Sequence, residues 1–157
     1  QRGRQRIAFA AAQLDPRTMQ RLDGWRKALK AAKLYDKTLS YTDKSPSSMA
    51  LGGEILKRIM ANDPSIDAIF FCNDDLAQGA LLAAQRLKIK VPQQLAIAGF
   101  NDLTGSDLIG PGLTTILTPR AAIGEAAAKM LLSLMREEAV PTTSVDVGYE
   151  LMVRGST

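Results

Sequence analysis

The fold of this chain is decided by the stretch Asp67-Ala68-Ile69-Phe70-Phe71-Cys72-Asn73-Asp74. Its apolar residues follow one another without alternation, which is typical of a strand buried on both faces of a parallel sheet. Asn73 and Asp74 are residue types that begin helices, and a segment of helical period follows them to Leu87. The stretch therefore predicts a buried strand that leads directly into a helix.

The same succession of a strand and then a helix continues on both sides of this stretch. Apolar runs at residues 6–11 and 95–100 predict buried strands, and a weaker strand is expected at 37–41. Helices are expected to begin at Asp15-Pro16 and Ser45-Pro46, because Asp and Ser suit the N-cap and Pro suits the first helical position. Strands that alternate with helices indicate βαβ units. The sequence thus predicts an α/β fold with a doubly wound, mostly parallel sheet.

Apolar periodicity also predicts which helix faces are buried and how the chain ends. We expect an extended segment at 113–117, a helix from about Pro119 and a closing strand at 145–153. The first helix is expected to face the core through Met19, Leu22, Trp25, Leu29 and Ala32. The last helix is expected to bury Ile123, Ala127, Met130, Leu131 and Leu134.

The composition excludes several classes of enzyme and metal site. The 157 residues are 46% hydrophobic and 23% charged, which is typical of one globular domain. There is no histidine, so Ser-His-Asp catalysis and imidazole metal ligands are excluded. The single cysteine, Cys72, excludes an intramolecular disulfide. Glycine-rich nucleotide motifs and a nucleophile elbow are also absent. We therefore expect no catalytic residue, no metal, no cofactor and no enzymatic activity.

Charge and hydropathy limit the partners of the chain. The net charge is +4, and the one tight basic cluster, Arg2, Arg4 and Arg6, is interpreted as a solvated start to the first strand. No apolar run reaches the roughly 18–20 residues that cross a bilayer, and no signal-peptide pattern opens the chain. The sequence predicts a cytoplasmic protein that neither enters a membrane nor reads nucleic acid with these residues.

Ligands of doubly wound sheets bind beyond the carboxyl ends of the strands, so candidate residues are sought there. At the first end, Arg17 and Arg21 are four residues apart on one helix face and could clamp a carboxylate. The alternative is a solvated basic face that pairs with Asp15 or Asp23. At the second end, Asn73 could bind a hydroxyl group, although Asn is also a preferred N-cap.

The third strand end carries Phe100 and Asn101. Phe100 could form an apolar wall, and the Asn101 amide could meet ligand hydroxyl groups. The alternative is an ordinary loop with Asx-turn hydrogen bonds.

Taken in order, the segments resemble the effector-binding core of the lactose/galactose-repressor family of bacterial transcription regulators. The resemblance covers nearly the whole chain and rests on the following motifs: Arg6-Ile7-Ala8-Phe9, Arg21-Leu22-Asp23-Gly24-Trp25, Asn73-Asp74 with Ala77 and Gly79-Ala80, Val91-Pro92, Ala96-Ile97-Ala98-Gly99-Phe100 and Leu113-Thr114-Thr115-Ile116. Leu117-Thr118-Pro119-Arg120 and Asp15 with Arg17-Thr18 look most like the gluconate-utilisation repressors. Residues 101–109 are not typical of that subgroup.

The resemblance implies a periplasmic-binding-protein-like architecture of two subdomains. Residues 6–112 and 143–155 would form the C-terminal subdomain, and residues 114–140 would return to pack on an N-terminal subdomain. That subdomain and the helix-turn-helix headpiece, through which members of this family bind operator DNA, are expected to lie outside this chain. A homodimer is expected through the helix at 74–88 and the loop at 102–109.

The resemblance also assigns roles to individual residues. Arg21 matches the ligand-clamping arginine, and Arg17 lies one turn earlier, where relatives use polar groups. Asn101 stands where sugar-binding members often have Asp, and a neutral side chain there suits an anionic effector. Ser47 stands where several members place an aromatic platform. The full expected effector-binding set is Arg17, Arg21, Ser47, Asn73, Phe100 and Asn101.

The function implied is the effector-binding portion of a transcriptional repressor that senses a small sugar acid similar to gluconate and controls DNA binding allosterically. A solute-binding protein of a sugar transporter has the same fold and is the alternative. An enzyme on a doubly wound sheet is a third possibility, for which the sequence offers no nucleophile and no cofactor loop.

Overall fold

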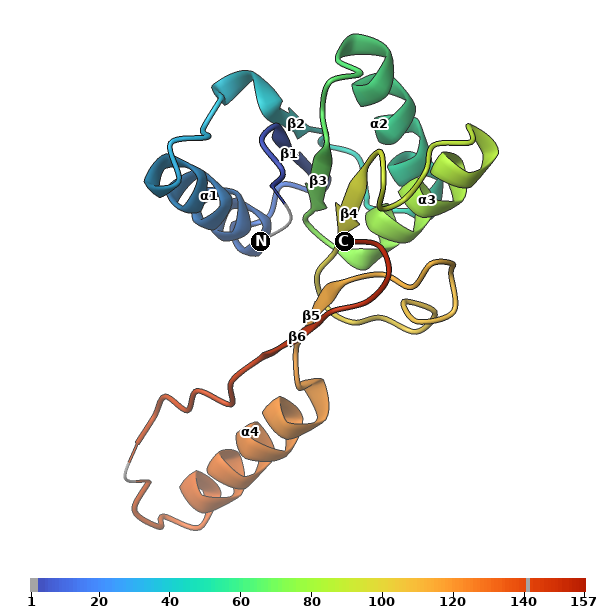
Figure 1. The fold of residues 1–157 in the computed structure, drawn as a ribbon. Helices are drawn as coiled ribbons and strands as arrows, with labels where there is room; N and C mark the ends of the chain where they lie inside the picture. The colour runs from blue at the N-terminus through green and yellow to red at the C-terminus, as the bar shows by residue number, and fades with distance from the viewer. Residues whose placement is uncertain (1–2, 141) are drawn as a thin grey trace.

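The computed structural model describes residues 3–140 and 142–157. Its centre is a parallel sheet in the order β2-β1-β3-β4, formed by β1 (Ile7–Ala11), β2 (Ser40–Thr42), β3 (Ala68–Phe71) and β4 (Ala96–Ala98). Helix α1 (Pro16–Ala31) covers one face, and α2 (Met49–Asn62) and α3 (Asp74–Arg86) cover the other (Figure 1). The predicted doubly wound parallel sheet is therefore confirmed.

Side-chain caps explain where the helices begin. The Asp15 carboxylate accepts the backbone N–H of Thr18 at 2.8 Å, as the sequence predicted for the start of α1. The second helix begins at Met49 rather than near Ser45, because Ser48 supplies the cap by accepting the N–H of Leu51. The strand expected at 37–41 was also misplaced: Lys37–Leu39 forms a 3-10 turn, η1, and β2 starts at Ser40.

The core lies between the sheet and its helices. Phe9, Ile69, Phe71 and Ile97 from the sheet are at most 1% exposed. Helix α1 buries Leu22, Trp25 and Leu29 against the sheet as expected, but Met19 and Ala32 are exposed, so the buried face is narrower than predicted.

Helices α2 and α3 approach each other closely at two glycines. A methyl group at Gly79 would overlap the Met49 carbonyl, and one at Gly52 would overlap the Leu76 carbonyl. Hydrogen is the only side chain that these two positions can accommodate without moving a helix. This close packing forms the second layer over the sheet.

A second part of the molecule projects from this body (Figure 1). Strands β5 (Thr115–Leu117) and β6 (Glu150–Met152) pair antiparallel and carry α4 (Arg120–Met135) away from the sheet. We call the sheet β1–β4 with α1, α2 and α3 the body, residues 118–149 the arm, and β5 with β6 the neck. The closing strand expected at 145–153 is confined to β6. Next to the neck the chain is bonded to the body, since Gly99 N–H donates to Thr114 O and Ile97 N–H to Ser156 O.

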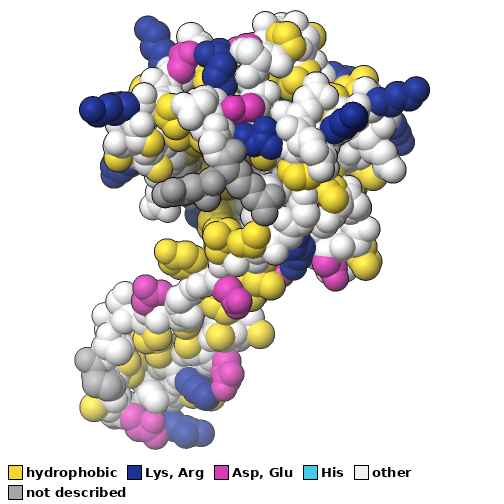
Figure 2. Space-filling model, viewed as in Figure 1, with side chains coloured by type: hydrophobic (Ala, Val, Ile, Leu, Met, Phe, Trp, Pro, Cys, Tyr) yellow, Lys and Arg dark blue, Asp and Glu magenta, His cyan; other side chains and the backbone are white. Residues whose placement is uncertain are grey.

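No residue of α4 is buried, so the predicted buried stripe was wrong. Ile123 is 46% exposed, and Leu131 and Leu134 are each 59% exposed, because the helix extends away from the layers of the body. Figure 2 shows hydrophobic side chains along the visible face of the arm and neck. Within the described ranges, no helix is long and apolar enough to cross a membrane.

Candidate functional site

The candidate site lies at the carboxyl-terminal edge of the sheet, where Arg21 joins two strand ends. Arg21 Nη1 donates to the carbonyl oxygen of Cys72, just after β3, at 2.9 Å. The Arg21 Cζ atom lies 4.0 Å from the centroid of the Phe100 ring, which follows β4. Of the predicted residues, Arg21 and Phe100 are thus brought into direct contact. Nothing in the sequence indicated the Cys72 carbonyl, because every residue carries one.

The charge of Arg21 is held in a partly buried position. Burial lowers the pKa of its guanidinium from the ordinary value, and nearby negative charges only partly oppose this shift. Among the residues that the structure describes, none places a carboxylate within 4.0 Å of it. Because an arginine pKa lies so far above neutral pH, the group keeps its charge. It can therefore bind an external planar anion through its remaining N–H groups.

Arg17 lies in a different environment although it is on the same helix. Its side chain is 79% exposed, and Nη2 lies 3.1 Å from the carboxylate of Asp15. The same carboxylate caps α1, and the N–H bond from Thr18 is the main cause that lowers its pKa. The two arginines therefore contact different partners. The exposed Arg17 pairs with Asp15, as expected for the alternative of a solvated basic helix face.

Asn73, just after β3, contacts Ser47 in the loop before α2. Asn73 caps α3, since its Oδ1 accepts the N–H of Leu76 at 3.1 Å. The Ser47 hydroxyl oxygen lies 2.8 Å from Asn73 Nδ2 and 3.0 Å from Oδ1. The capping role of Asn73 is therefore observed, and it also connects the loop before α2 to this edge of the sheet.

Asn101 is held through its backbone. Its φ is +116°, in the left-handed region that non-glycine residues rarely occupy. Its N–H donates to Ile116 O at 2.9 Å, and its carbonyl accepts from Arg120 Nη1 at 2.7 Å. No hydrogen bond to its side-chain amide is found among the described residues. These backbone contacts connect Asn101 to the neck and to the start of α4.

Asp74 organises the loop beyond Asn101, which the sequence did not reveal. Its side chain is fully buried and accepts hydrogen bonds from Thr115 Oγ1 at 2.6 Å, Leu103 N at 2.7 Å and Ser106 Oγ at 3.1 Å. From the sequence, Asp74 was expected to begin a helix. An adjacent pair of acids at a helix N-terminus gives no signal that one of them turns inward.

Arg154 fixes the other side of the same loop. Its Nη1 donates to Asp102 Oδ1 at 2.7 Å and to Leu113 O at 2.8 Å. The hydrogen bond with Asp102 raises the pKa of the Arg154 guanidinium. Arg120 at the start of α4 and Arg154 just after β6 thus both donate hydrogen bonds to residues 101–102. Neither arginine was singled out from the sequence as a functional residue.

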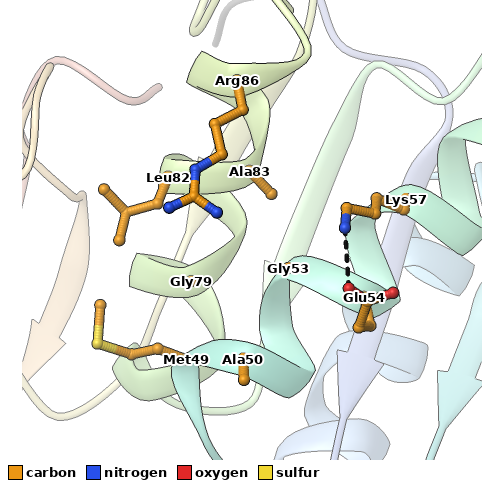
Figure 3. A pocket seen from close by; sticks show the side chains of 9 residues that line it. All are labelled: Met49, Ala50, Gly53, Glu54, Lys57, Gly79, Leu82, Ala83 and Arg86. Carbon is orange, nitrogen blue, oxygen red and sulfur yellow. Dashed lines mark hydrogen bonds and ion pairs between the residues drawn. The ribbon is translucent and has the colours of Figure 1, made fainter.

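A separate pocket lies between the outer faces of α2 and α3, away from the strand ends (Figure 3). It encloses about 340 Å³. Leu82 and Met49 form apolar walls, while Arg86 projects over the groove opposite Glu54, which is paired with Lys57 at 2.8 Å. None of the predicted site residues lines this pocket. One wall of the pocket is α3, which lies in the helix through which a homodimer was expected.

The described residues offer no metal centre and no reactive thiol. Across residues 3–140 and 142–157, no cluster of three or more Cys, Asp or Glu side chains could hold an ion. Cys72 is fully buried, and burial raises the pKa of its thiol. The site therefore consists of one fixed arginine, amides, a hydroxyl group and an aromatic ring, which is a set suited to binding.

Comparisons with known proteins agree with this description. Residues 1–157 match the family model of the periplasmic binding protein-like domain. The HTH-type transcriptional regulator GntR of Pseudomonas aeruginosa is 53% identical over 156 residues, which are 99% of this chain and 46% of that protein. The chain thus spans about half the length of the curated relatives it matches.

Solved structures give the same result. The transcription regulator GntR from Chromobacterium violaceum superposes with a TM-score of 0.97 at 52% identity, covering 99% of this chain and 57% of that one. The transcriptional regulator CelR in complex with cellobiose gives a TM-score of 0.88 at 28% identity, covering 99% and 47%. All three relatives are transcription regulators by name.

Proposed function

Because this chain belongs to the periplasmic binding protein-like family, and within it to the lactose/galactose-repressor regulators, we propose that it binds a small sugar-acid effector for a bacterial transcriptional repressor. One observation carries the proposal: Arg21 holds a positive charge at the strand ends, where no described carboxylate pairs with it. A partly buried charge of this kind is stabilised when an anion binds.

The neighbouring polar groups suit the rest of such a ligand. Asn73, Ser47 and Asn101 supply amide and hydroxyl groups that can bond to a polyol chain. Asn101 adds no negative charge, so it does not repel a carboxylate. Arg17 is exposed, so its contribution is a longer-range attraction rather than a second clamp. Gluconate or a close relative satisfies both the charge and the hydroxyl groups.

We also propose the domain assignment that the resemblance implies. Residues 6–112 and 143–155 belong to a C-terminal subdomain, and residues 114–140 pack on an N-terminal subdomain. The exposed apolar residues of α4 support this arrangement, since a helix with so much apolar surface is stabilised by a covering partner. Operator DNA is then bound in the cytoplasm by a headpiece outside this chain.

The proposed homodimer uses the outer face of α3. Leu82 is partly exposed in the groove between α2 and α3, and Leu108 in the following loop is 79% exposed. Leu76 and Leu81, by contrast, are buried in the core and are not available to a partner. The apolar groove flanked by Arg86 and Glu54 supports self-association, because each copy presents both charges.

The experiment that tests the effector proposal is calorimetry on the full regulator with gluconate and with neutral glucose. A charged hydrogen bond contributes about 1.5–3 kcal/mol, so Arg21→Ala should weaken gluconate binding by about ten- to a hundredfold. Arg21→Lys should restore only part of this affinity, because an ammonium cannot form the planar fork. Arg17→Ala is the matched control and should have a smaller effect. Equal affinities for glucose and gluconate, or no effect of Arg21→Ala, would contradict the proposal.

A further inference from the structure

The Arg21 guanidinium is restrained by two contacts of different kinds. The hydrogen bond from Nη1 to Cys72 O at 2.9 Å fixes one direction within the guanidinium plane. The Arg21 Cζ atom also lies over the Phe100 ring, 4.0 Å from the ring centroid. A hydrogen bond at one N–H and an aromatic ring in contact with the guanidinium together oppose rotation about the last bonds of the side chain.

Phe100 is itself held in place by the fold. Its carbonyl accepts the N–H of Asp74 at 3.1 Å, which ties it to the first turn of α3. Gly99, just before it, is buried, and a side chain there would overlap the Asp74 carboxylate. The position of the ring is therefore fixed by the end of the strand. Because Arg21 covers one face of the ring, that face cannot also form an apolar wall for a ligand.

We propose that Phe100 is a positioning residue: with the Cys72 carbonyl it fixes the plane of Arg21, so that the remaining N–H groups meet a planar anion in one orientation. The inference rests on the proposed function for its ligand, but the restraint itself belongs to this chain. In this proposal Phe100, which carries no charge, contributes to the preference of the site for a sugar acid over a neutral sugar.

The physical reason is preorganisation in a partly desolvated place. An arginine side chain has several rotatable bonds, and restricting them before binding reduces the entropy lost with the ligand. The ring replaces water on one face of the cation through a cation–π contact and uses none of its N–H donors. The lowered pKa of Arg21 is consistent with this loss of water. An anion then meets a cation that is less solvated and already oriented.

The first test needs no effector. In nitrogen-15 NMR of the chain, the Arg21 side-chain N–H resonances should be shifted by the ring current and should exchange slowly, with exposed Arg17 as an internal reference. Phe100→Leu should move the Arg21 signals toward those of Arg17, and Phe100→Tyr should preserve them because it keeps the ring. Phe70→Leu, the same change in the neighbouring strand β3, is the control. Unchanged Arg21 signals in Phe100→Leu would overturn the proposal.

The second test separates this inference from the proposed function. In the full regulator, Phe100→Leu should weaken gluconate binding about tenfold and weaken glucose binding much less. An equal loss for both sugars would mean that Phe100 contacts the effector or only supports the fold, and would contradict the inference. If Arg21→Ala removes the preference for gluconate but Phe100→Leu does not, the inference fails and the proposed function stands. If wild type shows no preference, the proposed function fails, and the NMR result decides the positioning role alone.

Discussion

Helices α1 and α4 both have 16 residues, yet α1 buries side chains against the rest of the molecule and α4 does not. The sequence of α1 is polar over much of its length, and it buries four residues against the sheet. The sequence of α4 is rich in Ala, Leu and Met, and it buries none. Apolar content therefore does not decide burial in this chain. What decides it is whether another element packs over the apolar face.

The same contrast separates the body from the arm. The body buries its apolar residues between a sheet and helices on both faces, and its helices α1 to α3 begin at side-chain caps. Helix α4 begins at Arg120, and no side chain caps its N-terminus at Pro119. We expect the stability of the chain to reside in the body, and four experiments test this expectation.

The largest expected effect comes from removing a core side chain in the body. Phe71 is fully buried in β3, so Phe71→Ala should reduce the free energy of unfolding by about 3–5 kcal/mol. Leu134→Ala in the arm, where the side chain is 59% exposed, should change it by about 0.5 kcal/mol at most. Urea unfolding followed by circular dichroism measures both. Similar losses in the two variants would show that the arm is packed as the body is.

A smaller contrast uses one substitution at two glycines. Gly79→Ala should destabilise the chain by about 2–3 kcal/mol, because the methyl group meets the Met49 carbonyl where α2 and α3 cross. Gly124 in α4 has open space around it, so Gly124→Ala should strengthen the helix by about 0.5–1 kcal/mol. Thermal unfolding and helical circular dichroism measure these changes. A destabilising Gly124→Ala would argue for a neighbour packed against α4.

A third test concerns the ion pair beside the neck. Asp102 and Arg154 have side chains only 17% and 20% exposed, and their atoms lie 2.7 Å apart. A double-mutant cycle with Asp102→Asn and Arg154→Met should give a coupling energy of about 1–2 kcal/mol. Arg136 and Glu138 form a pair on the arm at 3.9 Å with both side chains exposed, so their cycle should give at most about 0.5 kcal/mol. Equal couplings would remove the distinction between the two regions.

The smallest expected effect is a pH dependence of the α1 cap. The Thr18 N–H lowers the pKa of Asp15 in the folded chain, so the ionised cap contributes stability above the unfolded pKa and loses it as the pH falls through the lowered pKa. Asp15→Asn keeps the cap but does not titrate. The stability advantage of wild type over Asp15→Asn should therefore shrink between about pH 5 and pH 2. An advantage that stays constant over this range would contradict the assignment.

Much of the fold could be read from the sequence, because its signals are local. The unbroken apolar run before Asn73 predicted a buried parallel strand, and Asp15-Pro16 predicted the start of α1. These features depend on neighbours a few residues away, so spacing and residue type suffice to find them. The second helix was placed a few residues too early because Ser45 and Ser48 are equally good caps by type.

The site was only partly predictable, for the opposite reason. The sequence determined that a doubly wound sheet would place Arg21, Asn73 and Asn101 at its carboxyl-terminal edge. Only the tertiary structure decided that Arg21 would contact a carbonyl 51 residues away and the Phe100 ring, that Arg17 would turn to Asp15, and that Asp74 would be buried. It also decided that α4 would be left exposed. Such contacts depend on how distant segments meet in space, and periodicity along a chain records only which face is apolar, not what covers it.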